Sequence, residues 1–198
     1  MVVFGSSLKA ETNVNSVLTK GNEFASEKKY AEAIEQYKTV LQTDPQNIQA
    51  NLFAGLAYAN LNKFDEAIQY TQKSLAADPS YAAYYNLGLI YAAANQPDKA
   101  LSALEEALKI NPESYMAEYQ KGIVYTIQKD YEGAAKSYQR SIELNPDFEE
   151  AHIGLAGAAY KKGDQAQALN YIAELKSKQK DTLAQALEEW IKKENATA

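Results

Sequence analysis

An Asp-Pro or Asn-Pro dipeptide recurs along the chain at a nearly constant interval, and this interval constrains the fold more than any other feature. The prolines follow one another after 34, 33 and 34 residues, at Pro45, Pro79, Pro112 and Pro146. A column of small residues keeps the same interval, at Gly21, Gly55, Gly88, Gly122 and Ala156. A period of this length indicates a repeat architecture, in which each copy buries its apolar face against its neighbours.

Each copy carries the pattern of two amphipathic helices. In the third copy, apolar or small residues recur at the i, i+3, i+4 and i+7 positions of one helical face, at Tyr84, Leu87, Gly88 and Tyr91. The segment NQPDKA interrupts this face, and Pro97 suits the first turn of a second helix, which then runs to the next Asn-Pro. Because the connections are only a few residues long, we expect the two helices to lie antiparallel.

The residues of the third copy resemble the tetratricopeptide repeat family. Its pattern of a large residue, Leu, Gly, aromatic, Ala, aromatic, Ala and Pro is matched at Tyr84, Leu87, Gly88, Tyr91, Ala100, Leu104, Ala107 and Pro112. Other copies depart locally from it, with Val40, Ser74 and Ser141 in place of an Ala. The resemblance implies an all-α fold, a right-handed superhelical solenoid of antiparallel helix pairs.

The repeat period also predicts the domain organisation. We expect five copies over residues 14–179, at 14–47, 48–80, 81–114, 115–148 and 149–179. A flexible N-terminal tail is predicted for 1–13, and a capping helix followed by a C-terminal tail for 180–198. The apolar stripe of this last helix is Leu183, Leu187, Trp190 and Ile191, and we expect Trp190 to be a packing anchor.

The residue inventory argues against catalysis, cofactors and metals. The chain has no Cys and a single His, His152, so the usual thiolate and imidazole ligand sets are missing, and no nucleophilic triad or phosphate-binding glycine loop is present. A net charge of −6 with Arg140 as the only arginine argues against nucleic-acid binding. No apolar run in the sequence is long enough for a membrane-spanning helix, so membrane insertion is not expected.

By resemblance, the first helix of each pair lines a concave groove that binds a protein or peptide. The residues predicted to line it are Asn22, Leu52, Phe53, Leu56, Tyr85, Asn86, Leu89, Met116, Tyr119, Ile123, Thr126 and Tyr160, and Leu18, Ile153 and Gly157 fall in the same columns. This set is mostly apolar and aromatic, which is typical of a surface that receives an amphipathic segment. Alternatively, Leu52, Leu56 and Leu89 pack between copies.

Tyr84, which belongs to the family pattern, is adjacent to Tyr85, which belongs to the predicted groove set. Neighbouring residues on a helix point about 100° apart, so the two rings cannot share one face. We therefore expect Tyr84 to pack against its partner helix and Tyr85 to face the groove.

Cochaperones of this family hold the acidic C-terminal tail of heat-shock chaperones with a clamp of lysine, arginine and asparagine side chains. The corresponding positions here are Leu18, Asn22, Phe53, Ala82 and Asn86. Only Asn22 matches, and none of the cations is present, so a carboxylate would lack its charge-assisted partners. A chaperone tail is therefore not the expected ligand.

The sequence thus predicts a non-catalytic adaptor that binds a hydrophobic or amphipathic segment of a partner protein. The alternative is a self-assembling scaffold that uses the groove or the ends of the solenoid to form homo-oligomers. We expect the protein in the cytoplasm because the segment MVVFGSSLKAET lacks a basic region. Export to the periplasm remains the alternative, since Ser7–Ala10 resembles the end of a signal peptide.

Overall fold

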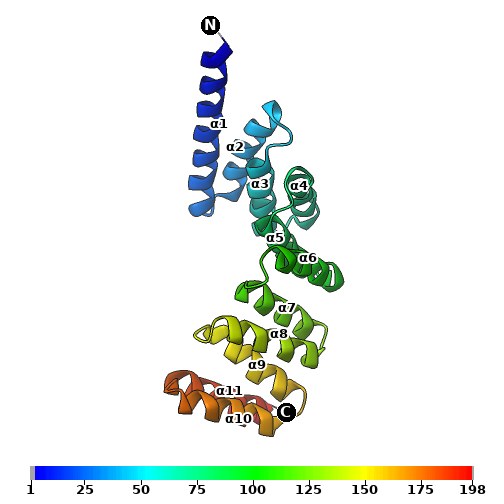
Figure 1. The fold of residues 1–198 in the computed structure, drawn as a ribbon, viewed down its shortest axis with the longest axis vertical. Helices are drawn as coiled ribbons and strands as arrows, with labels where there is room; N and C mark the ends of the chain where they lie inside the picture. The colour runs from blue at the N-terminus through cyan, green and yellow to red at the C-terminus, as the bar shows by residue number, and fades with distance from the viewer. Residues whose placement is uncertain (1–2, 198) are drawn as a thin grey trace. The chain divides into compact units, whose positions relative to one another are not determined.

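The computed structural model describes the backbone of residues 3–197 and the side chains of residues 13–193. The chain divides into two compact units, with the boundary between Ile110 and Asn111. The helices of the first unit are α1 (Val3–Ser26), α2 (Tyr30–Thr43), α3 (Ile48–Asn60), α4 (Phe64–Ala77), α5 (Tyr81–Ala93) and α6 (Pro97–Ile110) (Figure 1). Those of the second unit are α7 (Tyr115–Ile127), α8 (Tyr131–Leu144), α9 (Glu149–Lys161), α10 (Gln165–Ser177) and α11 (Asp181–Thr197).

These elements are five successive helix pairs followed by one further helix, as the repeat pattern predicts. The N-terminal boundary differs from the prediction, because α1 begins at Val3 and not near residue 14. No proline interrupts this stretch. Once a helix has formed, each further residue that joins it adds a hydrogen bond. Most of the segment predicted as a tail is therefore helical, and residues 1 and 2 lie outside the described part.

The two helices of each pair are joined by the same turn. One residue of the turn has a positive φ angle, at Lys28, Asn62, Asn95, Lys129 and Gly163 in the five pairs. The next backbone N–H then donates to a carbonyl five residues earlier, as from Lys29 to Phe24 at 2.8 Å and from Asp130 to Tyr125 at 2.9 Å. This arrangement satisfies the carbonyl groups at the helix end and reverses the chain within a few residues.

Three of the first helices, α3, α5 and α7, begin with a side-chain cap, whereas α9 begins after Phe148 without one. Asn47, Ser80 and Ser114 each accept a hydrogen bond from the backbone N–H three residues later. Such caps typically stabilise a helix by about 1 kcal/mol. At these three boundaries, Asp/Asn-Pro ends one helix pair, and a capping residue two or three positions after the Asp or Asn starts the next.

The small residues of the repeat allow the paired helices to approach closely. The Ala column is fully buried, at Ala33, Ala67, Ala100, Ala134 and Ala168. A Cβ atom at Gly122 of α7 would lie 2.5 Å from Tyr138 Cε1 of α8, so a side chain at this position would force the tyrosine ring to move. Ser74 and Ser141, which depart from the family pattern, donate hydrogen bonds to the carbonyls of Ile48 and Tyr115 at 3.0 and 2.9 Å. These two serines thus tie the second helix of their pair to the start of the first.

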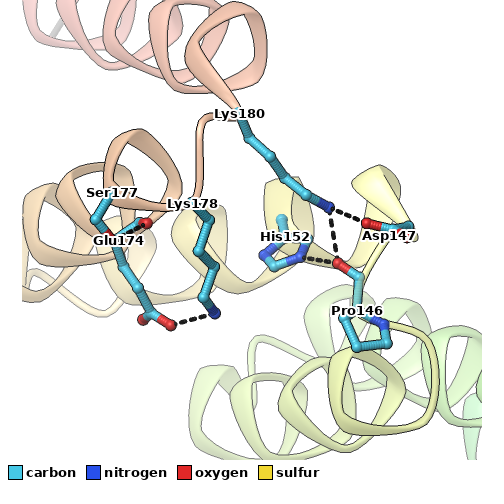
Figure 2. A network of polar contacts seen from close by, with 7 residues as sticks. All are labelled: Pro146, Asp147, His152, Glu174, Ser177, Lys178 and Lys180. Atoms are coloured by element: carbon cyan, nitrogen blue, oxygen red, sulfur yellow. Dashed lines mark hydrogen bonds and ion pairs between the residues drawn. The ribbon is translucent and has the colours of Figure 1, made fainter.

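In the second unit, polar contacts fasten the connection between α10 and α11 to the start of α9 (Figure 2). Lys180 Nζ donates to the Pro146 carbonyl at 2.8 Å and lies 3.0 Å from an Asp147 carboxylate oxygen. His152 Nε2 donates to the same carbonyl at 2.9 Å and is buried. Asn51 makes the equivalent contact with Pro45 at 3.0 Å. The single histidine therefore has a structural role.

Thr71 on α4 is a polar residue in the core of the second helix pair, and its replacement tests how a buried hydroxyl group affects stability. It is fully buried, and its Oγ1 has no hydrogen-bond partner in the described part of the chain. Thr71→Val keeps the shape and removes the unsatisfied group, so we expect the free energy of unfolding to rise by about 1 kcal/mol. Urea denaturation checks this, with Ser74→Ala as the control that removes a bonded hydroxyl and lowers stability. A lower midpoint for Thr71→Val would contradict the prediction.

Candidate functional site

The predicted groove residues lie on the first helices of the pairs, and all of them except Leu18 are at least partly exposed. In the first unit these helices are α1, α3 and α5, which carry Asn22, Leu52, Phe53, Leu56, Tyr85, Asn86 and Leu89. In the second unit they are α7 and α9, which carry Met116, Tyr119, Ile123, Thr126 and Tyr160. Leu18 is different, because it is only 5% exposed and belongs to the core cluster that includes Ala50 and Ala54 of α3. Its prediction as a groove residue is wrong.

The first unit has a small hollow, which we call the unit-1 hollow. It measures about 140 Å³ and is lined by Asn22, Ala25, Tyr30, Tyr37, Phe53, Leu56, Ala57 and Asn60. The Tyr37 hydroxyl donates to Asn22 Oδ1 at 2.8 Å, and the Tyr37 and Phe53 ring centroids lie 5.8 Å apart. Burial raises the pKa of the Tyr37 phenol, which keeps it protonated as a donor. The hollow thus brings together three predicted residues, Asn22, Phe53 and Leu56.

The second unit has a larger cavity, which we call the unit-2 cavity. It measures about 410 Å³ and is lined by Thr126, Tyr138, Ile153, Gly154, Gly157, Ala158, Lys161, Ala186, Leu187 and Trp190. Its walls come from α7, α8, α9 and α11. Trp190 is half-buried, and its ring meets the Tyr160 ring edge to face, with centroids 5.3 Å apart at 70°. The cavity is therefore largely apolar, with aromatic and aliphatic walls.

Two hydroxyl groups lie at one end of the unit-2 cavity. Thr126 Oγ1 donates to the Gly122 carbonyl at 2.8 Å, so at 3.2 Å it accepts the proton of the Tyr138 hydroxyl. Burial raises the pKa of Tyr138, and the Thr126 contact opposes this shift more weakly. The phenol is thus neutral at ordinary pH, and both hydroxyl protons are already donated. This end of the cavity offers hydrogen-bond acceptors and no activated nucleophile.

The sequence reasoning missed most of the cavity walls. Trp190 was expected only as a packing anchor, and Lys161, Leu187 and Tyr138 were not assigned to a site. The sequence did indicate a second role for Trp190. Because Trp190 and Ile191 are adjacent on a helix, only one of the two side chains can face the hydrophobic core. Ile191 is 4% exposed and takes the core position. Trp190 therefore packs on Tyr160 and also lines the cavity.

Several predicted groove residues lie outside both hollows. Tyr85 stacks on Tyr81, with ring centroids 5.6 Å apart. Tyr84 and Tyr85 are both half-buried, so their burial does not distinguish the core role expected for Tyr84 from the groove role expected for Tyr85. Tyr119 lies in an aromatic cluster, 5.0 Å from the Phe148 ring and 5.7 Å from the Tyr138 ring. Burial is the main cause of the raised pKa of Tyr119. Substitutions of Tyr119 would therefore alter stability as well as binding.

Neither hollow offers the ligands of a metal site. Within the described residues, no group of three or more His, Asp or Glu side chains is placed to hold a metal ion. No helix in that same part of the chain is long and apolar enough to cross a membrane. The two hollows are lined by apolar side chains, a few hydroxyl and amide groups, and the side chain of Lys161, whose Nζ lies 6.0 Å from the centroid of the Tyr160 ring.

Family models of the tetratricopeptide repeat match most of the chain. One model matches residues 24–90 and 125–191, and a second matches residues 85–147. The matched ranges include helices of every pair in the structure.

Curated relatives match about half of this chain. Hsp70-Hsp90 organizing protein 3 of Arabidopsis thaliana is 30% identical over 96 residues, which is 48% of this chain and 17% of the relative. Small glutamine-rich tetratricopeptide repeat-containing protein 2 of Saccharomyces cerevisiae is 29% identical over 92 residues, 46% of this chain and 27% of the relative. The similarity thus covers only a small share of these longer proteins.

Solved structures match nearly the whole chain. A crystal structure of MamA protein has a TM-score of 0.74 at 26% identity, covering 89% of this chain and 92% of MamA. YrrB, described as a TPR protein with an unusual peptide-binding site, has a TM-score of 0.71 at 19% identity, covering 96% and 98% of the two chains. These similarities confirm the all-α repeat fold predicted from the sequence.

Proposed function

The chain belongs to the tetratricopeptide repeat family, whose repeats form protein-interaction modules, and on this basis we propose that it is an adaptor. In this proposal it binds a hydrophobic or amphipathic segment of a partner protein on the surfaces that carry the unit-1 hollow and the unit-2 cavity. The segment contributes apolar side chains, and the module contributes preformed apolar walls.

The unit-2 cavity is the observation that carries this proposal. Its volume of about 410 Å³ lies within the range of roughly 300–1,000 Å³ found for binding clefts. Ile153 on its wall is 46% exposed, although it is a large apolar residue. Transfer of apolar surface out of water lowers the free energy. An apolar side chain of a partner that displaces water from these walls therefore binds favourably.

An acidic chaperone tail does not fit the proposal, although several relatives are named for Hsp70 and Hsp90. The positions of the family's carboxylate clamp carry no cation here. One of them, Leu18, is buried in the core, and another, Asn22, accepts the hydrogen bond from Tyr37. An apolar segment is therefore favoured over an acidic one as the principal ligand.

Selection of phage-displayed peptides on the purified 198-residue chain tests the proposal. We expect selected peptides to be rich in aromatic and aliphatic residues, and Ile153→Asp to weaken their binding at least tenfold because it places a charge on an apolar wall. Leu169→Asp is the matched control, because Leu169 on α10 is 49% exposed and lies outside the cavity. Equal binding by wild type and Ile153→Asp would count against the proposal.

Sedimentation of the same variants separates adaptor function from self-assembly. An adaptor remains a monomer as its concentration rises, with or without Ile153→Asp. A concentration-dependent oligomer that Ile153→Asp dissociates would show instead that a second copy occupies the cavity. That result would favour the scaffold function over the adaptor.

A further inference from the structure

Phe148 departs from the repeat pattern at the start of α9. The residue one repeat earlier, Ser114, caps α7 by accepting a hydrogen bond from the Ala117 N–H, whereas α9 begins after Phe148 without a side-chain cap. A helix start without such a cap is typically less stable. The Phe148 ring instead packs on α7, with its centroid 5.0 Å from those of both Tyr115 and Tyr119. At this position the chain therefore carries an aromatic side chain in place of a helix cap.

Tyr115, Tyr119 and Phe148 form a group of rings that we call the unit-2 aromatic cluster. The Phe148 ring is inclined at 66° to the Tyr115 ring and at 82° to the Tyr119 ring, so the ring faces point in different directions. All three residues are partly exposed. The face of an aromatic ring carries the negative part of its quadrupole and attracts cations. The cluster therefore offers a partly exposed surface that favours a positive charge.

Glu150 adds a carboxylate beside this cluster. It is exposed and lies in the first turn of α9. Burial is the main cause of the raised pKa of Tyr119, and the negative charge of Glu150 raises this pKa further, so the carboxylate lies within electrostatic range of the phenol. Glu149 is exposed in the same turn, but its side chain points about 100° away from that of Glu150. One of the two neighbouring carboxylates thus acts on the aromatic cluster.

Elsewhere in the described part of the chain, tyrosine rings are paired with lysines of the protein itself. Lys73 Nζ lies 5.0 Å from the centroid of the Tyr70 ring, and Lys99 Nζ lies 5.5 Å from that of the Tyr91 ring. Among the described residues, no lysine or arginine lies over a ring of the unit-2 aromatic cluster, and none forms an ion pair with Glu150. The aromatic faces and the carboxylate are therefore available to a cation from outside the chain.

We propose that the unit-2 aromatic cluster and Glu150 bind a lysine or arginine side chain of the partner segment. This inference rests on the proposed function, because it adds a positive charge to the apolar segment that the adaptor binds. Met116, next to Tyr115 on α7, and Ile153, three residues after Glu150 on α9, are each 46% exposed, so apolar residues of the segment find contacts on the same two helices. The cation stacks on the rings and pairs with the carboxylate, and the net charge of −6 attracts a basic segment.

N-acetylarginine amide is a suitable probe, because it carries the proposed cation without an apolar segment. Its neutral counterpart of similar shape is N-acetylcitrulline amide. In NMR titrations of the 198-residue chain, we expect the arginine probe to shift the ring signals of Tyr119 and Phe148 saturably, and the citrulline probe to leave them in place. Equal shifts by the two probes would overturn the inference.

The role of the carboxylate is tested with Glu150→Gln, which keeps the shape of the side chain and removes its charge. We expect the arginine probe to bind about threefold to tenfold more weakly, as for an exposed ion pair combined with a cation–π contact. Glu149→Gln is the matched control, because it removes the same charge from the same helical turn and affects the helix dipole alike. Equal loss of binding in the two variants would contradict a local site and reduce the effect to net charge.

The phage-selected peptides test the same contact within a segment. We expect those selected on wild type to carry Arg or Lys near their apolar residues. Replacing this Arg by citrulline, or this Lys by acetyl-lysine, should weaken binding to wild type about fivefold. The same replacement should matter little for Glu150→Gln, and less for Phe148→Leu, which keeps an apolar side chain and lacks the aromatic face. Residues with a merely structural role would weaken the charged and neutral peptides equally.

The outcomes distinguish failure of this inference from failure of the proposed function. If the charged and neutral forms of a selected peptide bind wild type equally, the inference is overturned, and the proposed function stands because the apolar peptide still binds. If wild type selects no apolar peptides, the proposed function fails and the inference fails with it.

Discussion

Tyr138→Ala is expected to lower the free energy of unfolding by about 3–5 kcal/mol, as is typical when a buried aromatic side chain is truncated. The Tyr138 ring is 4% exposed and packs against two glycines, Gly122 on α7 and Gly154 on α9. It therefore links three successive helices of the second unit, and its removal leaves a void beside the unit-2 cavity. Urea denaturation of the purified chain measures the loss.

Tyr138→Phe is the control that separates the ring from its hydroxyl group. This variant keeps the packing of the ring and removes only the hydrogen bond to Thr126. We expect it to lower the free energy of unfolding by about 1 kcal/mol. If Tyr138→Phe and Tyr138→Ala lose similar stability, the ring does not link the helices as described.

The repeat columns allowed the fold to be predicted because each column has a local physical cause. The Gly and Ala columns mark positions where paired helices touch, and Asp/Asn-Pro marks where a pair ends. These contacts and helix ends occur within one copy or between adjacent copies, so the residues that form them recur with the period of the repeat. The extension of α1 to Val3 could not be predicted in this way, because it lies before the first copy and has no counterpart in the repeat pattern.

The candidate site was predictable only in part, for the same reason. Asn22, Phe53, Leu56 and Thr126 occupy repeat positions on first helices, and the structure places them at the two hollows. The walls supplied by Leu187 and Trp190 come from α11, which follows the last copy and has no counterpart in the repeat pattern. Their position depends on how α11 packs against α9 and α10, which the periodicity does not specify.

Gly157 shows a second limit of the sequence pattern. Its column placed it on the predicted groove surface, but the sequence does not reveal whether a glycine is required by packing. Gly154 and Gly157 lie about one helical turn apart on α9, and only the structure shows that a Cβ atom at the first would clash with Tyr138, while one at the second would meet Trp190 at an ordinary contact distance of 3.8 Å. Two residues of the same type thus have opposite expected responses to substitution by alanine.

Gly122→Ala is expected to lower the free energy of unfolding by about 1–3 kcal/mol, because its methyl group would lie 2.5 Å from the Tyr138 ring. The hydroxyl bond to Thr126 and the neighbouring Tyr119 ring restrict any shift of the tyrosine. In the Tyr138→Ala background this clash is absent, so the same substitution should instead add about 0.5–1 kcal/mol through helix propensity. A double-mutant cycle by urea denaturation measures this reversal. Additive losses would show that Gly122 and Tyr138 do not constrain each other.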